Sequence, residues 1–482
     1  MILSNDFGVA NGIPAFVLNM SRDFGVASRV RKVSGPLLLV ATLALFHPAH
    51  MSAQARPTAD LVIRNARVVV GDGRVISSAD IGIRGGIITS IDPAGARAAG
   101  AGSPGSDSFG TRLIDAAGRT VIPGLIDAHV HADGWTLPVF LKYGVTSVRD
   151  LHSDGPFIFP LAKDDSPAHP RIVTSGPLID GVGSFWKNAV QVASLGEARA
   201  AVRRAVDQGA AVIKVYTRLD PALIAAVASE ARARGVPVAA HLGFATAAQA
   251  ADAGVTSIEH LSGIADAASD EPRRLLAAHQ DFLGGWTAFE LEWQRIPFAR
   301  LESVAKQLVA RGIVIVPTLA LHEAFARMAD ADLMKDPALS EVPAAILRDA
   351  WNPVDIMGRA KWTAATLAAF KQTLPILRRF VGMYAHLGGR IAAGTDTPQQ
   401  FVVPGVSLHR EMELYVASGL TPAQALKTAT VEAAALLGIQ DRVGLVAVGK
   451  TADLVVLDAD PLIDIRNTRR IWMVVKGGTV IR

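Results

Sequence analysis

The sequence predicts an α/β protein: a (β/α)8 TIM barrel with a small β-sandwich domain built from both ends of the mature chain. Short apolar segments alternate with alanine-rich helical segments through the middle of the 482 residues. Strand-like segments with glycine turns flank this middle part on both sides. Polar residues stand where the middle strands end, the place where such barrels hold active sites. The predicted divisions are a signal peptide (1–55), the barrel (121–440) and two sandwich parts (56–120 and 441–482).

The first 55 residues have the pattern of an export signal. Four basic residues between positions 22 and 32 precede the apolar run 36–46, and "AQA" at 53–55 is a suitable cleavage site. The apolar run is too short to span a bilayer, so we expect no membrane span after cleavage. A signal that starts at Met20 would have ordinary proportions. The expected location is the periplasm or the extracellular medium.

Composition narrows the function classes. The chain has no cysteine, which excludes disulfides and thiolate metal sites, so a metal would need His, Asp, Glu or a modified Lys. The formal net charge of +4 falls to +2 without residues 1–55, which hold four basic and two acidic residues. No basic cluster follows, which argues against nucleic acid as a partner. A small molecule is the expected ligand, and a homo-oligomer is compatible with the sequence.

The two ends of the mature chain share a hairpin pattern. "GDG" at 71–73 and "RGG" at 84–86 interrupt alternating apolar residues, as in short β-hairpins. The same pattern returns in the segments 448–462 and 469–482. We therefore expect strands from both ends to form one small β-sandwich.

The middle of the chain offers eight strands. Its last helix is marked by Thr421 as N-cap, Pro422 in the first turn and Gly438 at the end. Long connections before and after the seventh strand carry four tryptophans, which either form a wall over the site or pack the outer helices. These are Trp286, Trp293, Trp351 and Trp362. The eight candidate strands end at or near His131, Leu151, Gly176, Tyr216, His241, His260, Leu319 and Asp396.

The first barrel strand carries two histidines one residue apart, in "PGLIDAHVH". Because side chains alternate along a strand, Asp127, His129 and His131 share one face. The carboxyl ends of barrel strands meet at one place, so residues from other strand ends can join them. The further candidates are Lys214, His241, His260 and Asp396.

Each candidate alone also has a structural interpretation. A single histidine is more often a surface or satisfied core residue, and Asp396 in "GTDTP" could cap a helix. Lys214 on a strongly apolar strand is harder to explain, because an unpaired buried ammonium group is costly. The joint occurrence of these residues at strand ends in barrel order favours a shared site.

"PGLIDAHVH", the lysine of the fourth strand, the histidines of the fifth and sixth strands and "GTD" resemble the amidohydrolase superfamily. The branch resembled is the binuclear metal-dependent one around Xaa-Pro dipeptidases and imidazolonepropionase-like hydrolases. "LTPAQALKTATVEAAALLG" followed by "GLVAVGKTADLVVLDADPL" is similar to the closing helix and sandwich return of that branch. The resemblance covers nearly everything after Ala59.

The resemblance implies two divalent metal ions, zinc in the first instance. His129, His131 and Asp396 would hold the buried ion, and His241 and His260 the more exposed one. Lys214, carboxylated by CO₂, would bridge both ions, which explains a lysine whose amine is desolvated and therefore neutral. Asp127 would orient a neighbouring ligand without binding metal itself.

The implied reaction is hydrolysis of an amide, peptide or cyclic amide C–N bond in a small substrate. A hydroxide bridging the metals would attack, while Asp396 acts as general base and then as general acid. Members of this branch act on varied substrates, and a dipeptide or N-acyl amino acid is the interpretation adopted here. Tyr216, His152 and His322 are candidates for binding substrate, and Arg218 is a further loop candidate.

Two other function classes remain open. A mononuclear aminohydrolase, or a lactonase, of the same superfamily would share the two histidines and the aspartate. "HLGFA" after His241 lacks the acidic helper usual in such deaminases, and Lys214 is present, so both features argue against deamination. A barrel that has lost catalysis and binds partners is expected to lose ligands, whereas all six are present here.

Overall fold

The computed structural model describes residues 59–95 and 111–482. The predicted signal peptide at 1–55 lies outside these residues and stays a prediction. Within the described ranges, no helix combines the length and apolar character needed to cross a membrane.

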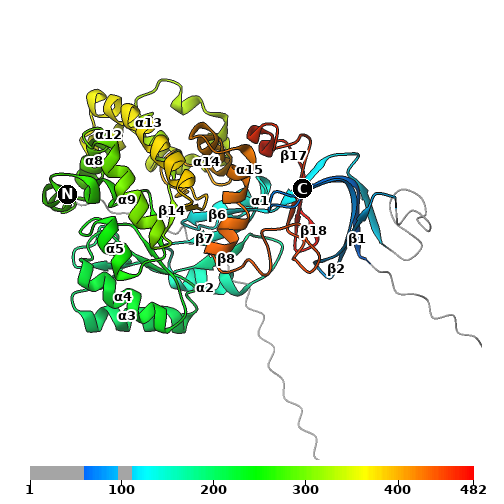
Figure 1. The fold of residues 1–482 in the computed structure, drawn as a ribbon, viewed down its shortest axis with the longest axis horizontal. Coiled ribbons are helices and arrows are strands. Elements are labelled where there is room, and N and C mark those ends of the chain that lie inside the picture. The colour runs from blue at the N-terminus through cyan, green and yellow to red at the C-terminus, as the bar shows by residue number, and fades with distance from the viewer. Residues whose placement is uncertain (1–58, 96–110) are drawn as a thin grey trace, which may run out of the picture. The chain divides into compact units, whose positions relative to one another are not determined.

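Eight parallel strands form the predicted barrel, with helices around them (Figure 1). Neighbouring strands pair directly, except that the third and fourth are linked by a hydrogen bond of 2.9 Å from Ala211 N–H to Thr174 O. A parallel bridge between Val130 and Thr397 closes the ring. The strands are β6 (Leu125–Val130), β7 (Val145–Asp150), β8 (Arg171–Thr174), β11 (Ile213–Val215), β12 (Val238–Ala240), β13 (Ser257–Glu259), β14 (Val314–Val316) and β15 (Arg390–Ile391).

Helices follow the strands, and local sequence sets their ends. For example, the helix over 195–208 begins with a capping box between Ser194 and Glu197 and ends at Gly209, whose φ of 117° suits glycine. The helices up to the sixth strand are α1 (Thr136–Lys142), α2 (Gly155–Lys163), α3 (Leu195–Gln208), α4 (Pro221–Ala233) and α5 (Ala247–Ala253). Two short strands, β9 (Ile179–Gly181) and β10 (Val190–Val192), extend the sheet beside β11.

The long connections around the seventh strand are helical. Between β13 and β14 lie α6 (Ile264–Ala268), α7 (Pro272–Ala278), α8 (Phe282–Glu292) and α9 (Phe298–Ala310). Between β14 and β15 lie α10 (Leu319–Ala326), η1 (Leu333–Lys335), η2 (Pro337–Glu341), α11 (Ala344–Asp349), α12 (Pro353–Ala360) and α13 (Ala364–His386). After β15 come α14 (Val406–Ala417), α15 (Pro422–Thr428) and α16 (Val431–Leu436).

The predicted closing helix is two helices instead of one. Thr421 caps α15 and Pro422 begins it, as predicted, but the helix ends at Thr428 and α16 starts at Val431. Two carbonyl oxygens at the junction between α15 and α16 accept hydrogen bonds from the backbone of the barrel. Ala393 N–H donates to Thr428 O at 3.0 Å, and Ile126 N–H donates to Ala429 O at 2.8 Å. Thr430, with φ −132° and ψ −88°, is not helical, so the α-helical ladder is interrupted there.

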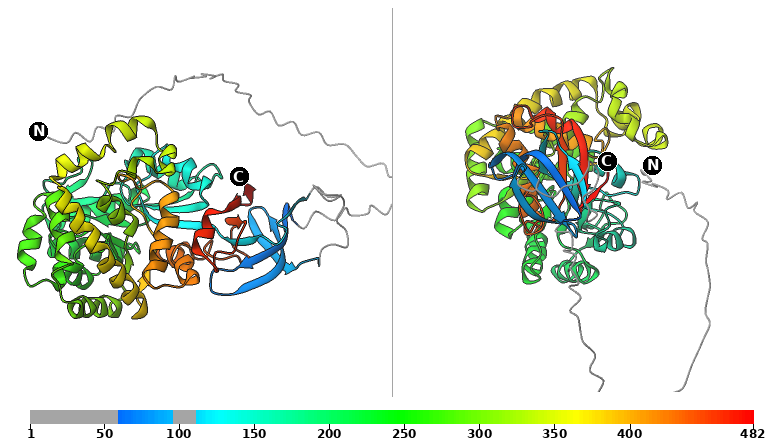
Figure 2. Two further views of the ribbon diagram at one scale, coloured as in Figure 1. Left: turned by 90° about the horizontal axis from the view of Figure 1, so that it is seen from above. Right: turned by 90° about the vertical axis from the view of Figure 1, so that its right-hand side faces the viewer.

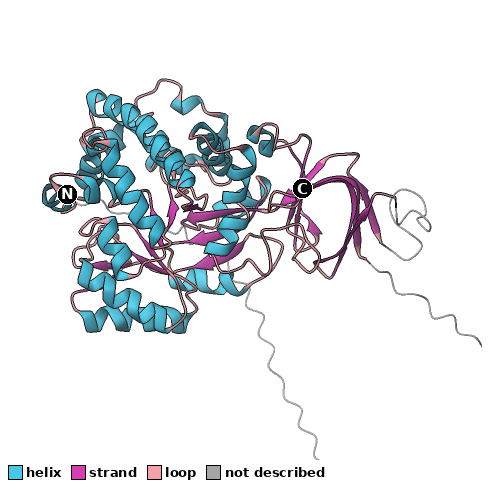
Figure 3. Ribbon diagram, in the orientation of Figure 1, coloured by secondary structure: helices cyan, strands magenta, loops and turns pink. Residues whose placement is uncertain are grey.

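The two ends of the described chain build one eight-stranded sheet, which curls around its own core (Figures 2 and 3). Antiparallel pairing of β5 with β16 joins the N-terminal strands to the C-terminal ones, as the hairpin pattern predicted. The predicted fold class is therefore confirmed. The strands are β1 (Leu61–Val69), β2 (Val75–Arg84), β3 (Ile87–Pro93), β4 (Arg112–Asp115), β5 (Thr120–Pro123), β16 (Leu454–Leu457), β17 (Ile471–Lys476) and β18 (Thr479–Val480), with η3 (Ile465–Arg469) before β17.

Candidate metal centre

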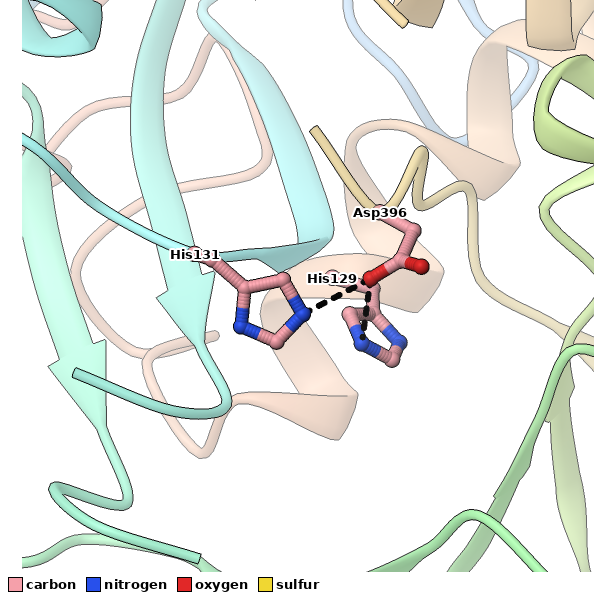
Figure 4. Close-up of side chains that lie close together, drawn as sticks. All are labelled: His129, His131 and Asp396. Carbon is pink, nitrogen blue, oxygen red and sulfur yellow. Dashed lines mark hydrogen bonds and ion pairs between the residues drawn. The ribbon is translucent and has the colours of Figure 1, made fainter. Parts of the chain in front are cut away.

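His129, His131 and Asp396 meet at the carboxyl end of the barrel (Figure 4). Asp396 Oδ1 lies 2.8 Å from His131 Nε2 and 3.2 Å from His129 Nε2. The potential ligand atoms of the three side chains all lie within 4.8 Å of one another. The segment before Asp396 is bound to β6, because Asp396 N–H donates to His129 O at 2.8 Å. Strand alternation and barrel closure together thus create a three-ligand group.

Two further histidines extend this group along the strand ends. The ring of His260 lies 4.6 Å from that of His129, and the ring of His241 lies 4.6 Å from that of His260. Burial holds the pKa of both His241 and His260 well below the usual value. They are therefore neutral imidazoles, the form that binds metal ions.

Lys214, in the middle of β11, is buried, and its Nζ has no hydrogen-bond partner. Burial lowers the pKa of this amine to about 8, although the nearby carboxylates of Glu259 and Asp396 act in the opposite direction. A neutral amine fraction is thus available for carbamate formation. The six predicted ligands therefore come from five strands to one end of the barrel.

The residues present fit a bound divalent metal. His129 Nε2 is buried and faces Asp396 without hydrogen-bond geometry, and Lys214 Nζ is likewise buried without a partner. Burying such polar atoms is costly unless something satisfies them. Imidazole nitrogens and carboxylate oxygens are ligands that zinc and similar ions accept.

A buried ion pair that the sequence analysis missed holds His129 in place. His129 Nδ1 donates to Glu259 Oε2 at 2.7 Å, which leaves Nε2 for a ligand. Arg149 Nη2 contacts both Glu259 oxygens, at 2.9 and 3.0 Å. Burial alone would raise the pKa of Glu259, but Arg149 and His129 lower it to about 2. The sequence did contain a signal for this ion pair, because Arg149 in "VTSVRD" and Glu259 in "TSIEH" are opposite charges within apolar strand segments.

Asp127 contacts the backbone near the metal ligands. Its carboxylate accepts hydrogen bonds from His129 N–H at 3.2 Å, from Thr395 N–H at 3.0 Å and from Thr395 Oγ1 at 2.7 Å. Burial raises the pKa of Asp127 to about 7. The side chain thus ties β6 to the segment before Asp396, while the imidazole of His129 is oriented by Glu259.

The predicted substrate-binding residues lie in different surroundings. Tyr216 is buried with its ring 4.8 Å from that of His241, next to the ligand group. His152 accepts from Leu178 N–H at 3.2 Å and donates through Nε2 to Asn188 Oδ1 at 2.9 Å, so both ring nitrogens are engaged. His322, fully buried, donates to Glu290 Oε1 at 2.8 Å.

Arg218 reaches the carbonyl oxygens of Val182 at 3.0 Å and Gln280 at 3.2 Å. It joins two loops in this way.

The four tryptophans of the long connections divide between the two interpretations. Trp286 lies near the ligand group, with its ring 6.1 Å from that of His260 and stacked on His322 at 5.2 Å. The other three pack in hydrophobic clusters: Trp293 against Phe380, Trp351 against Phe401 and Trp362 against Phe370. Only one of the four therefore faces the site.

The model of the Amidohydrolase family matches residues 120–481, three quarters of the chain. The chain belongs to the amidohydrolase family. This result confirms the resemblance on which the ligand set was assigned. The matched range begins at β5 and runs through the whole barrel to the last strands.

Individual relatives agree with this assignment. Adenine deaminase of Mesorhizobium japonicum is 38% identical over 103 residues, which are 20% of this chain and 16% of that protein. The chain thus matches about a sixth of the length of this relative. A putative prolidase of Bifidobacterium longum has a TM-score of 0.64 at 24% identity, covering 87% of this chain and 94% of that one. A Xaa-Pro dipeptidase with bound methionine has a TM-score of 0.62 at 21% identity, covering 88% and 99%.

Proposed function

We propose that the protein is a metal-dependent hydrolase that cleaves a C–N bond in a dipeptide or an N-acyl amino acid. The observation that carries this proposal is the group of His129, His131 and Asp396 beside a buried, unpartnered Lys214. A buried lysine amine without a hydrogen-bond partner in such a place is explained if CO₂ converts it to an anionic ligand. The prolidase-like fold neighbours support the choice of substrate class.

His129, His131 and Asp396 would hold one ion, His241 and His260 a second, and carboxylated Lys214 would bind both. Two divalent ions, zinc in this proposal, would supply a nucleophilic hydroxide at neutral pH and polarise the scissile carbonyl. Glu259 and Arg149 orient His129 for this purpose by fixing the proton on Nδ1.

Asp396 is the proton carrier in this proposal. Burial opposes its ionisation, but the neighbouring histidine rings hold its pKa well below the usual value, so the carboxylate is unprotonated and free to accept a proton. Its carboxylate would accept the proton of the nucleophile and return it to the leaving nitrogen. Tyr216, whose ring centre lies 4.8 Å from that of His241, is the residue that we propose donates its hydroxyl proton to the substrate.

The first test is metal stoichiometry by mass spectrometry of the full chain, grown with zinc and bicarbonate. We expect two equivalents per chain, falling sharply in Lys214→Ala and unchanged in Lys187→Ala, which removes an exposed lysine. One equivalent that is indifferent to Lys214 would contradict the binuclear mechanism and direct the search to mononuclear deamination or ring opening.

The second test identifies the bond that is cleaved. Dipeptides and N-acyl amino acids should release a free amino acid, whereas a deaminase would release ammonia from adenine and leave these substrates intact. In Asp396→Asn we expect turnover to fall about 10²–10⁴-fold, with a smaller change in substrate binding. Near-normal turnover in this variant with its metals retained would exclude Asp396 as the proton carrier.

A further inference from the structure

Thr318 lies in the turn between the seventh barrel strand and helix α10, and its side chain reaches a predicted metal ligand. Its Oγ1 lies 2.8 Å from Nδ1 of His260. Both side chains are buried, so the hydrogen bond is shielded from water. His260 directly follows β13, Thr318 lies shortly after β14, and these two strands pair with each other. The hydrogen bond therefore links two neighbouring strand ends within the candidate site.

The backbone of Thr318 has a conformation that its residue type disfavours. Its φ of 50° and ψ of 46° are left-handed, which costs free energy for a β-branched side chain. Glycine would adopt this turn without that cost. The side chain that makes the turn costly is the one that contacts His260, and strain of this kind points to a role for the side chain.

Glu411 on α14 holds this turn in place. Its two carboxylate oxygens accept hydrogen bonds from the N–H groups of Leu319 and Ala320, the first residues of α10, at 2.9 and 2.7 Å. The Glu411 side chain is fully buried. The first N–H groups of a helix have no partner within the helix, so a carboxylate that accepts two of them fixes the start of α10. Thr318, the residue before α10, is fixed with it.

A second threonine–histidine pair in the described part of the chain differs from this one at the other ring nitrogen. Thr468 Oγ1 lies 2.8 Å from Nδ1 of His409, and both side chains are buried. Nε2 of His409 contacts the carbonyl oxygen of Tyr143 at 3.0 Å, so protein atoms occupy both of its ring nitrogens. For His260, the described residues supply a hydrogen-bond partner at Nδ1 and none at Nε2. Its Nε2 therefore stays open to a ligand.

We infer that Thr318 is a positioning residue for His260: its hydroxyl accepts the Nδ1 proton and so leaves the lone pair of Nε2 for the second metal ion. This inference rests on the proposed function. A neutral imidazole carries one proton, so a hydroxyl that donated to Nδ1 would instead leave the proton on Nε2 and block a metal there. Glu411 acts through Thr318, because it fixes the turn that carries the hydroxyl.

Zinc affinity of the full chain, measured by competition with a chelator, tests this role. Thr318→Val keeps the shape of the side chain and removes the hydroxyl, so one of the two ions should bind about 10–100-fold more weakly while the other keeps its affinity. Thr318→Ser retains a hydroxyl and should bind both ions as the parent does. The control is Thr468→Val, which removes the matched hydroxyl beside His409 and should change neither affinity. Parent-like affinities in Thr318→Val, or equal losses in Thr318→Val and Thr318→Ser, would overturn the inference.

NMR of zinc-free protein with isotope-labelled histidine separates failure of this inference from failure of the proposed function. The spectrum reports which ring nitrogen carries the proton, and His260→Asn identifies the signal. We expect the proton on Nδ1 in the parent and in Thr318→Ser, and a mixture of both tautomers in Thr318→Val. A proton on Nε2 in the parent would overturn the inference even if two zinc ions bind. A proton held on Nδ1 by the Thr318 hydroxyl, in a protein that binds fewer than two zinc ions, would uphold the positioning role and refute the two-ion site of the proposed function.

Discussion

Glu259 Oε2 lies 2.7 Å from Nδ1 of His129, so a carboxylate on β13 sets the orientation of a ligand on β6. Ser257 Oγ donates to the other Glu259 oxygen at 2.6 Å, and Arg149 balances the charge. All of these side chains are buried. The metal-binding face of His129 therefore depends on a polar network inside the barrel.

Glu259→Gln should weaken metal binding by about 10–100-fold, because the amide cannot hold the His129 proton as a carboxylate does. The measurement is competition with a chelator on folded protein. Stability must be followed separately, since Arg149 loses its buried counter-ion at a cost of about 3–5 kcal/mol.

Glu290→Gln is the matched control for this substitution. Glu290 is equally buried and pairs with His322 at 2.8 Å, and its other carboxylate oxygen has no hydrogen-bond partner, so it bonds to none of the predicted ligand side chains. It should leave metal affinity unchanged. If both variants lose metal equally, general destabilisation explains the effect and Glu259 has no special role.

Gly394→Ala should disrupt the metal centre through packing alone. A Cβ at this position would lie 2.5 Å from Val316 Cγ1 and 2.8 Å from the backbone nitrogen of His129. Because moving backbone atoms in a packed barrel costs free energy, we expect His129 to shift and the metal content of the variant to fall below half that of the parent. Mass spectrometry of the purified variant is the measurement.

Gly358→Ala, within α12, provides the comparison, because a Cβ there meets no atom within 4 Å. Alanine favours helix over glycine by about 1 kcal/mol, so this variant should keep its metals and gain slightly in stability. Full metal content in Gly394→Ala would show that the barrel tolerates the added methyl group.

Much of the site follows from sequence because it depends on local rules. Alternation along a strand places His129 and His131 on one side, and the barrel rule brings the later strand ends to them. A lysine inside an apolar strand is conspicuous by its cost. These three inferences can be made without knowing which strands lie opposite each other in the barrel.

Other parts depend on distant geometry that the sequence does not display. Glu259 and His260 are adjacent, and strict alternation would give them opposite faces, but φ values of 59° at His260 and 57° at Leu261 turn the chain at that point. Arg149 reaches Glu259 across the barrel, from a strand that does not pair with β13. The face of α8 that meets His241 is likewise set by packing between separate helices.

Asp266→Asn should stabilise the protein, and more so at high pH. Asp266 is buried on α6 without a hydrogen-bond partner, and burial raises its pKa from 3.8 to about 7. As pH rises from about 4 to 7, the unfolded chain loses this proton while the folded chain keeps it, so the parent loses stability across that window. Above pH 7 the penalty is constant.

The advantage of Asp266→Asn should therefore grow by up to about 3 kcal/mol between pH 5 and pH 8. Thermal unfolding of variant and parent at the two pH values measures it. An advantage that does not change with pH would mean that Asp266 is ionised throughout, with a counter-charge in the folded protein.

Asp453→Asn should destabilise the protein strongly, because this carboxylate serves two buried cations. Asp453 Oδ2 lies 2.7 Å from Arg171 Nη1, and Oδ1 lies 3.5 Å from Lys476 Nζ, with all three side chains buried. Arg171 begins a barrel strand and Lys476 ends a strand of the curled sheet, so the network links the two. Removing the shared charge should cost about 3–5 kcal/mol of unfolding free energy, measured by urea denaturation.

Asp458→Asn is the control for the same chemical change at the surface. Asp458 pairs with Arg119 at 2.7 Å, but the two side chains are 39% and 31% exposed. Water screens such a pair, so its loss should cost no more than about 1 kcal/mol. Similar losses in the two variants would mean that water reaches the Asp453 network and that its charges contribute no more than a surface pair does.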